Sequence, residues 1–419
     1  MSNRFRMIAA MAAIYMIFAI LLNSVGTVIL QSMATFGVDK PHASLLEAFK
    51  DLSIAAFSFF VAAYLPRIGY RRAMLLALAI VAAACIMMRS FQSFRTTELL
   101  FACVGVAFAL TKVAVYSSIG LLTSDKREHS RLTNTIEGLF MIGVLLGGWL
   151  FSAFIDPVVP GNPVWFDVYG VLAGACIAAF ALLATTRLDE TAAHSAREKS
   201  FGEGFTEMLR LSSRPLVYVF LLSAFLYVLI EQSFSTWLPT FNNEILKLPN
   251  AMSIQIASIL AAATAIGRIG AGVVLRRVPW YVLLNLCVLG MGALILLSLP
   301  LAAGSVMREG AGWFDAPLAA YLIPSIGFLM APIYPVINSV ALSSLPKPLH
   351  ASMTGLIVVF SALGGTLGSR ITAIVFSTFD GVHAFYFSLV PMTLVLVTLF
   401  FFKRETDRAA APVAAAVAA

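Results

Sequence analysis

Glu231 lies in the middle of the otherwise apolar segment 218–238, and its carboxyl group is the clearest candidate for chemistry in this sequence. A carboxylate in the hydrocarbon core of a bilayer is energetically costly unless it faces protein or water. Ser223, Tyr227 and Ser235 stand at four-residue steps around it, so a helix places all four polar groups on one face. We therefore predict that Glu231 faces a polar cavity and carries a proton, with Tyr227 and Ser235 among the substrate-binding residues.

Lys112 and Glu137 form a second candidate site. They belong to segments 97–122 and 132–154, which we expect to be antiparallel helices, and both lie on the same side of mid-membrane. An ion pair would offset their desolvation, and loss of one member would strand the other. We favour this pair, with Glu137 as a further proton carrier. In the alternative arrangement Lys112 faces the cavity as the counter-charge of an anionic substrate or of Glu231.

A third cluster contains Glu47, Lys50 and Asp51, which stand at helical i, i+3 and i+4 spacing in the outer half of an expected span. We favour a solvated helix end for this cluster. The alternative is that Asp51 takes up a proton.

Composition identifies the elements that position these residues. Of the 419 residues 60% are hydrophobic and only 12% are charged, which indicates an integral membrane protein. A helix needs about 20 apolar residues to cross the hydrocarbon core. The sequence predicts twelve such spans, at 7–30, 45–65, 72–89, 97–122, 132–154, 168–186, 214–240, 251–275, 280–302, 316–343, 351–376 and 383–402.

The loops on one side of these spans hold most of the 28 Lys and Arg residues. Because cytoplasmic loops are enriched in Lys and Arg, we expect both termini in the cytoplasm. The same bias explains the net charge of +7 and gives no reason to expect nucleic acid as a partner. The four cysteines are scattered within spans, and the five histidines lie in loops or at span ends, so we expect no metal site. No nucleotide-binding or catalytic motif is present, so we expect no cofactor and no enzyme activity.

The spans fall into two halves of six. We expect an N-terminal bundle at 1–186, a central cytoplasmic loop at 187–213, a C-terminal bundle at 214–404 and a disordered Ala-rich tail at 405–419. Glycine and a pair of arginines recur at the ends of the second and the eighth spans, as Gly69 with Arg71 and Arg72 and as Gly272 with Arg276 and Arg277, which follow Gly267 and Arg268. This weak repeat is of the kind that the two halves of transporters show.

Twelve spans, a central loop and basic turns after spans two and eight resemble the major facilitator superfamily of secondary transporters. Arg67, Gly69, Arg71 and Arg72 match the family signature of the first basic turn, in which Pro66 replaces the usual Asp. The strings 225–231, 267–270 and 332–335 faintly resemble its fucose and other sugar symporters. The glycines of span five, Gly138, Gly143, Gly147 and Gly148, resemble those of its drug/proton antiporters, with Val144 in place of the expected Pro.

The resemblance implies an all-α membrane protein of twelve transmembrane helices in two pseudo-symmetric halves, with spans one, four, seven and ten around a central cavity. The polar residues of these spans fall on one side of each helix. Besides Tyr227 and Ser235, the expected substrate-binding residues are Asn23, Thr27, Gln31, Lys112, Tyr116, Tyr334 and Asn338. Gating or structural roles are expected for Arg67, Arg71, Arg268 and Arg370.

From these residues and the resemblance we expect a symporter of the bacterial inner membrane that works as a monomer. It would transport a small hydrophilic solute, such as a sugar or an organic acid, together with protons, with sodium as the other possible coupling ion. The alternative is a proton-driven efflux antiporter for drugs or other lipophilic compounds, which the span-five glycines favour and the missing Pro opposes.

Overall fold

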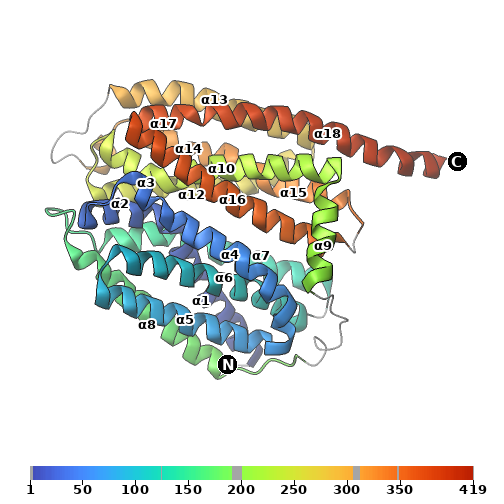
Figure 1. Ribbon diagram of the computed structural model, residues 1–419, viewed down its shortest axis with the longest axis horizontal. Coiled ribbons are helices and arrows are strands. Elements are labelled where there is room, and N and C mark those ends of the chain that lie inside the picture. The colour runs from blue at the N-terminus through green and yellow to red at the C-terminus, as the bar shows by residue number, and fades with distance from the viewer. Residues whose placement is uncertain (1–2, 124, 191–200, 305–311, 347–348, 419) are drawn as a thin grey trace. The chain divides into compact units, whose positions relative to one another are not determined.

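The computed structural model describes residues 3–123, 125–190, 201–304, 312–346 and 349–418. The chain forms two compact units, residues 1–201 and residues 202–419. All regular elements in the described ranges are helices (Figure 1). Within the described residues, eleven helical segments are long and apolar enough to cross a membrane. The 24-residue helix α4 (Leu45–Ile68) occupies the remaining expected span, so the fold is the twelve-helix fold that the sequence predicts.

The first unit follows the six expected spans, with a break in the first. Its helices are α1 (Asn3–Asn23), α2 (Val25–Phe36), α3 (Lys40–Ala43), α4, α5 (Tyr70–Phe91), α6 (Phe94–Leu122), α7 (Lys126–Ser152), the 3-10 turn η1 (Pro163–Phe166) and α8 (Asp167–Ala184).

The first span is interrupted at Ser24, between α1 and α2. There the Ser24 hydroxyl donates to the Leu21 carbonyl oxygen at 2.8 Å, and Asn23 Nδ2 donates to the Ala19 oxygen at 2.9 Å. Short polar side chains that bond the preceding turn compete with the regular helical ladder. The break therefore has a local cause in two adjacent polar residues.

The second unit contains the other six spans. Its helices are α9 (Phe201–Ser212), α10 (Pro215–Glu244), α11 (Asn250–Ala257), α12 (Ile259–Val274), α13 (Trp280–Ala303), the 3-10 turn η3 (Trp313–Asp315), α14 (Ala319–Met330), α15 (Ile333–Ser343), α16 (His350–Thr378), α17 (Gly381–Phe387) and α18 (Leu389–Ala418). The central segment 187–213, expected to be a loop, contains helix α9.

The C-terminal tail differs from expectation. The sequence predicts disorder at 405–419, whereas α18 continues as a helix to Ala418. Alanine has the highest helix propensity of all residues, and the run of alanines can extend a helix that already exists.

Glycines allow the closest helix contacts in both units. A Cβ on Gly105 of α6 would lie 2.4 Å from the Lys50 carbonyl oxygen of α4, and one on Gly368 of α16 would lie 2.3 Å from the Leu229 oxygen of α10. Small residues let helix backbones approach one another in membranes. These two contacts hold the helices that carry the charged residues against their neighbours.

The turn between α4 and α5 is held by the segment that follows α8. Gly69 has a φ of 89°, and the Glu190 carboxylate accepts hydrogen bonds from the amides of Tyr70 at 2.9 Å and Arg71 at 3.0 Å. The Arg71 guanidinium donates to the carbonyl oxygens of Leu183 and Ala184 at the end of α8. Arg71 thus ties α5 to α8, which agrees with a structural role. The side chain of Arg67 lies outside the described part of the structure.

Candidate functional site

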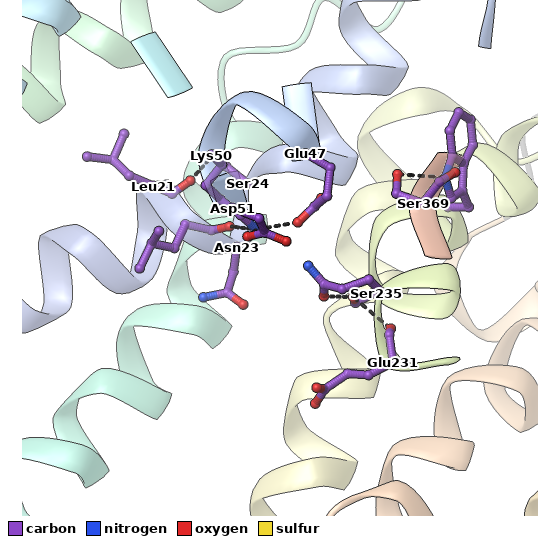
Figure 2. Close-up of polar contacts among 12 residues, drawn as sticks. Leu21, Asn23, Ser24, Glu47, Lys50, Asp51, Glu231, Ser235 and Ser369 are labelled. Atoms are coloured by element: carbon purple, nitrogen blue, oxygen red, sulfur yellow. Dashed lines mark hydrogen bonds and ion pairs between the residues drawn. The ribbon is translucent and has the colours of Figure 1, made fainter. Parts of the chain in front are cut away.

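Glu47, Lys50 and Asp51 form a buried charged triad in the first unit. The Lys50 ammonium pairs with the Glu47 carboxylate and lies 3.4 Å from Asp51 Oδ1 (Figure 2). The exposed fractions of the three residues are only 0%, 6% and 9% in chain order. Our expectation of a solvated helix end is therefore wrong. The three residues would have the same helical spacing in a solvated helix end and in a buried cluster. Their burial comes from the packing of neighbouring helices.

The triad also contacts the break in the first span. Lys50 Nζ lies 3.5 Å from the carbonyl oxygen of Leu22, two residues before Ser24. Near a helix break, carbonyl groups lose their intrahelical donors and need other partners. The ammonium group of α4 is one such partner, so the triad links the second span to the interrupted first span.

Tyr116, Glu137 and Lys112 lie together where α6 faces α1 and α7. The Tyr116 hydroxyl donates a short hydrogen bond to Glu137 Oε1. Lys112 is within electrostatic range of Glu137 but forms no ion pair with it within 4 Å, and its ammonium lies 5.9 Å from the centre of the Phe108 ring. The favoured Lys112–Glu137 pair is thus absent, because Tyr116 is the hydrogen-bonding partner of Glu137.

Aromatic rings surround this group. The ring centroids of Tyr15 and Tyr116 are 6.4 Å apart and edge-on, and Tyr15 contacts Phe140 in the same way at 5.7 Å. Phe108 lies 5.8 Å from Phe18 and 6.4 Å from Phe140. Phe108, Lys112 and Tyr116 stand at four-residue steps on α6, but this pattern alone does not predict that rings of α1 and α7 surround Lys112.

The expected binding residues of the first span differ in their surroundings. Asn23 is exposed and bonds its own helix, and Thr27 is buried. Gln31 is 1% exposed, and neither of its amide atoms has a hydrogen-bond partner among the described residues. Gln31 is therefore the polar group of this span with the greatest remaining capacity to form hydrogen bonds.

Glu231 contacts Tyr227 one turn away on α10, as the shared face predicts. The Tyr227 hydroxyl lies 3.2 Å from Glu231 Oε1 and 3.1 Å from the carbonyl oxygen of Met330 in α14. Tyr227 is also within electrostatic range of Arg268 in α12. Ser235 bonds the Glu231 carbonyl oxygen at 2.9 Å, within its own helix (Figure 2).

Tyr334 extends this group into the tenth span. Its ring stacks on that of Tyr227 with centroids 5.8 Å apart, and its hydroxyl is 2.9 Å from that of Ser361 in α16. Asn338 stands one turn further along α15, and its buried Oδ1 has no hydrogen-bond partner among the described residues. The sequence does not identify Ser361 as a site residue, because its local sequence resembles that of other serines within the spans.

The two arginines within the spans of the second unit differ in exposure. Arg268 is exposed on α12, next to Gly267, and Arg370 is half-buried in α16. The span-five glycine Gly143 packs against α1, since a Cβ there would lie 2.8 Å from the Met16 carbonyl oxygen. This contact gives Gly143 a packing role.

A family model described as the Major Facilitator Superfamily matches residues 8–369. The structure is similar to that of the nucleoside transporter NupG, with a TM-score of 0.73 and 14% identity over 96% of this chain and 99% of that chain. It is also similar to a bacterial homolog of the human lysosomal transporter Spinster, with a TM-score of 0.71 and 16% identity over 98% and 97% of the two chains. For the E. coli fucose:proton symporter FucP the TM-score is 0.62, with 14% identity over 97% and 99%.

No curated protein matches the chain in sequence. The structural likenesses, all at low identity, show the fold. The family match covers most of the chain and agrees with the twelve-helix architecture. The chain therefore belongs to the major facilitator superfamily of membrane transporters and is not an enzyme.

Proposed function

We propose that this chain is a proton-coupled symporter of a small hydrophilic solute, that it works by alternating access and that Glu231 carries the coupling proton. The contact of Tyr227 with both Glu231 and the Met330 carbonyl oxygen carries this proposal. A hydroxyl has one proton to donate and lone pairs to accept, whereas a carbonyl oxygen only accepts.

This arrangement satisfies both protonation states of Glu231. When Glu231 is ionised, the Tyr227 hydroxyl donates to the carboxylate. When Glu231 is protonated, its own O–H donates to Tyr227, whose proton turns to the Met330 oxygen. A buried polar group without a partner costs free energy, so a pair that remains bonded in both states lowers the barrier to proton uptake and release.

Proton symport agrees with one of the similar structures, FucP, which is named as a fucose:proton symporter. We further propose that the protein resides in the bacterial inner membrane as a monomer with both termini in the cytoplasm. Its Lys and Arg distribution supports that orientation.

The test is transport in liposomes that contain a pH-sensitive dye. Pools of sugars, organic acids and peptides are added outside, and acidification of the lumen reports symport. We expect Glu231→Gln to lose uphill accumulation driven by a pH gradient and to retain substrate exchange. Glu98→Gln, near the beginning of α6, is the matched control and should behave as wild type.

Undiminished uphill uptake by Glu231→Gln would rule out Glu231 as the proton carrier. If the wild type moves no protons with any hydrophilic pool but does so with lipophilic compounds, the protein is an efflux antiporter. If sodium replaces the pH gradient as the driving force, the coupling ion is sodium.

A further inference from the structure

Lys112 carries an exposed positive charge inside a membrane-spanning helix. It is 10 residues from the end of α6 at Leu122, which is about 15 Å at 1.5 Å per residue. No carboxylate lies within 4 Å of its ammonium group in the described part of the chain. A charge without a directly paired carboxylate at such a depth is costly, which makes Lys112 a candidate for a function.

Lys112 stands on a face of α6 that also contacts neighbouring helices of the first unit. Phe108 and Tyr116 stand one turn before and one turn after it, on the same face of α6. Phe108 contacts Phe18 of α1, and Tyr116 contacts Tyr15 of α1 and Glu137 of α7. The face of α6 that carries Lys112 is therefore the one that contacts α1 and α7.

The neighbouring ionisable groups do not neutralise Lys112 by direct contact. Glu137 accepts the hydrogen bond of Tyr116, and Tyr15 is buried against Tyr116. The triad of α4 meets α6 at Gly105, seven residues or about 10.5 Å along the helix from Lys112. The ammonium group can thus bind an added anion without breaking an existing ion pair.

We propose that the solute is a small organic anion and that Lys112 binds its carboxylate, with the rings of Phe108, Tyr15 and Phe140 beside its carbon skeleton. Lysine donates up to three hydrogen bonds from a compact charge, which suits a carboxylate. The inference rests on the proposed function, since it names the class of the transported solute. It selects the organic acids over the neutral sugars.

The test measures binding at one fixed pH in detergent, without a proton gradient. Two matched probe pairs differ in charge: gluconate against glucose, and benzoate against benzamide. We expect at least one carboxylate to raise the melting temperature of the wild type and its neutral partner to have no effect. Lys112→Gln should weaken binding of that carboxylate about tenfold or more, the loss expected for one charge-assisted hydrogen bond.

Lys112→Arg keeps the charge and should retain most of the binding, which separates loss of charge from loss of fold. Lys247→Gln changes an exposed lysine in a loop of the other unit and should bind as wild type. The proposal is overturned if neutral probes bind as tightly as carboxylates, if Lys112→Gln keeps full affinity, or if no carboxylate binds. It is also overturned if phosphatidylglycerol, and no carboxylate, stabilises the wild type through Lys112.

These experiments distinguish failure of the proposed anion site from failure of the proposed proton coupling. If carboxylates bind through Lys112 but no proton moves in the liposomes, the proposed coupling is wrong and the anion site remains. If protons move with neutral sugars, the coupling remains and the anion site is wrong.

Discussion

Replacement of Lys50 by Met should destabilise the first unit in a pH-dependent way. Lys50 pairs with Glu47 and Asp51, and all three side chains are buried. Met has a similar length and no charge, so the variant leaves the Glu47 and Asp51 carboxylates close together without the charge of Lys50. Removal of one partner from a buried ion pair costs about 3–5 kcal/mol. For a unit of this size, each kcal/mol lowers the melting temperature by about 2–4 °C, so we expect a loss of roughly 6–20 °C.

The assay is thermal unfolding in detergent between pH 5 and pH 8. The loss should be greatest at pH 8 and smaller at pH 5, because protonation of a carboxylate removes the stranded charge. The triple variant Lys50→Met, Glu47→Gln and Asp51→Asn has no charge in the cluster and should recover much of the stability. Lys247→Met is the control, with an expected change within about 0.5 kcal/mol. A Lys50→Met variant that melts with the wild type at pH 8 would refute the reasoning.

Two further predictions test the packing and one loop. Gly368→Ala should lower the melting temperature by the equivalent of about 1–3 kcal/mol, since its Cβ would lie 2.3 Å from a backbone oxygen of α10; Gly272→Ala, with open space around it, should not, and equal effects would contradict the contact. Hydrogen bonds from the amides of Val158 and Val159 and from Asn162 lower the pKa of Asp156 in the loop after α7. The carboxylate therefore supports the loop above its ordinary pKa and loses this effect as the pH falls through the lowered value. The protection factor of the Val158 amide, which corrects for the pH dependence of intrinsic exchange, should fall only below pH ~4, and Asp156→Ala should lower this factor above that pH and have little effect below it.

The positions of the spans follow from sequence because each is a long apolar run with charged residues at its ends. The break at Ser24 does not, since Asn and Ser occur in unbroken membrane helices as well. The burial of the triad cannot be predicted from the sequence either. Helical spacing places Glu47, Lys50 and Asp51 on neighbouring positions whether the helix end is wet or buried, and only the packing of α1 and α6 decides between them.

The candidate site was partly predictable for a related reason. Glu231 and Tyr227 are one turn apart on one helix, so their contact follows from the helical period. Glu137 has its partner on a different helix, and the sequence offers both Lys112 and Tyr116, one turn apart, as candidates. The choice between them depends on the rotation and spacing of α6 relative to α7, which no local pattern specifies.

The partners of the carboxylates within the spans separate two kinds of site. Glu231 and Glu137 each bond a tyrosine hydroxyl, which donates to a carboxylate and accepts from a carboxylic acid. Glu47 and Asp51 share Lys50, whose ammonium group only donates and requires a negative charge nearby. Protonation of both triad carboxyls would strand that cation, whereas protonation of Glu231 or Glu137 leaves a complete hydrogen bond. The tyrosine-linked carboxyls are therefore suited to a proton that is taken up and released, and the triad is suited to a fixed charge that joins α4 to the break in the first span.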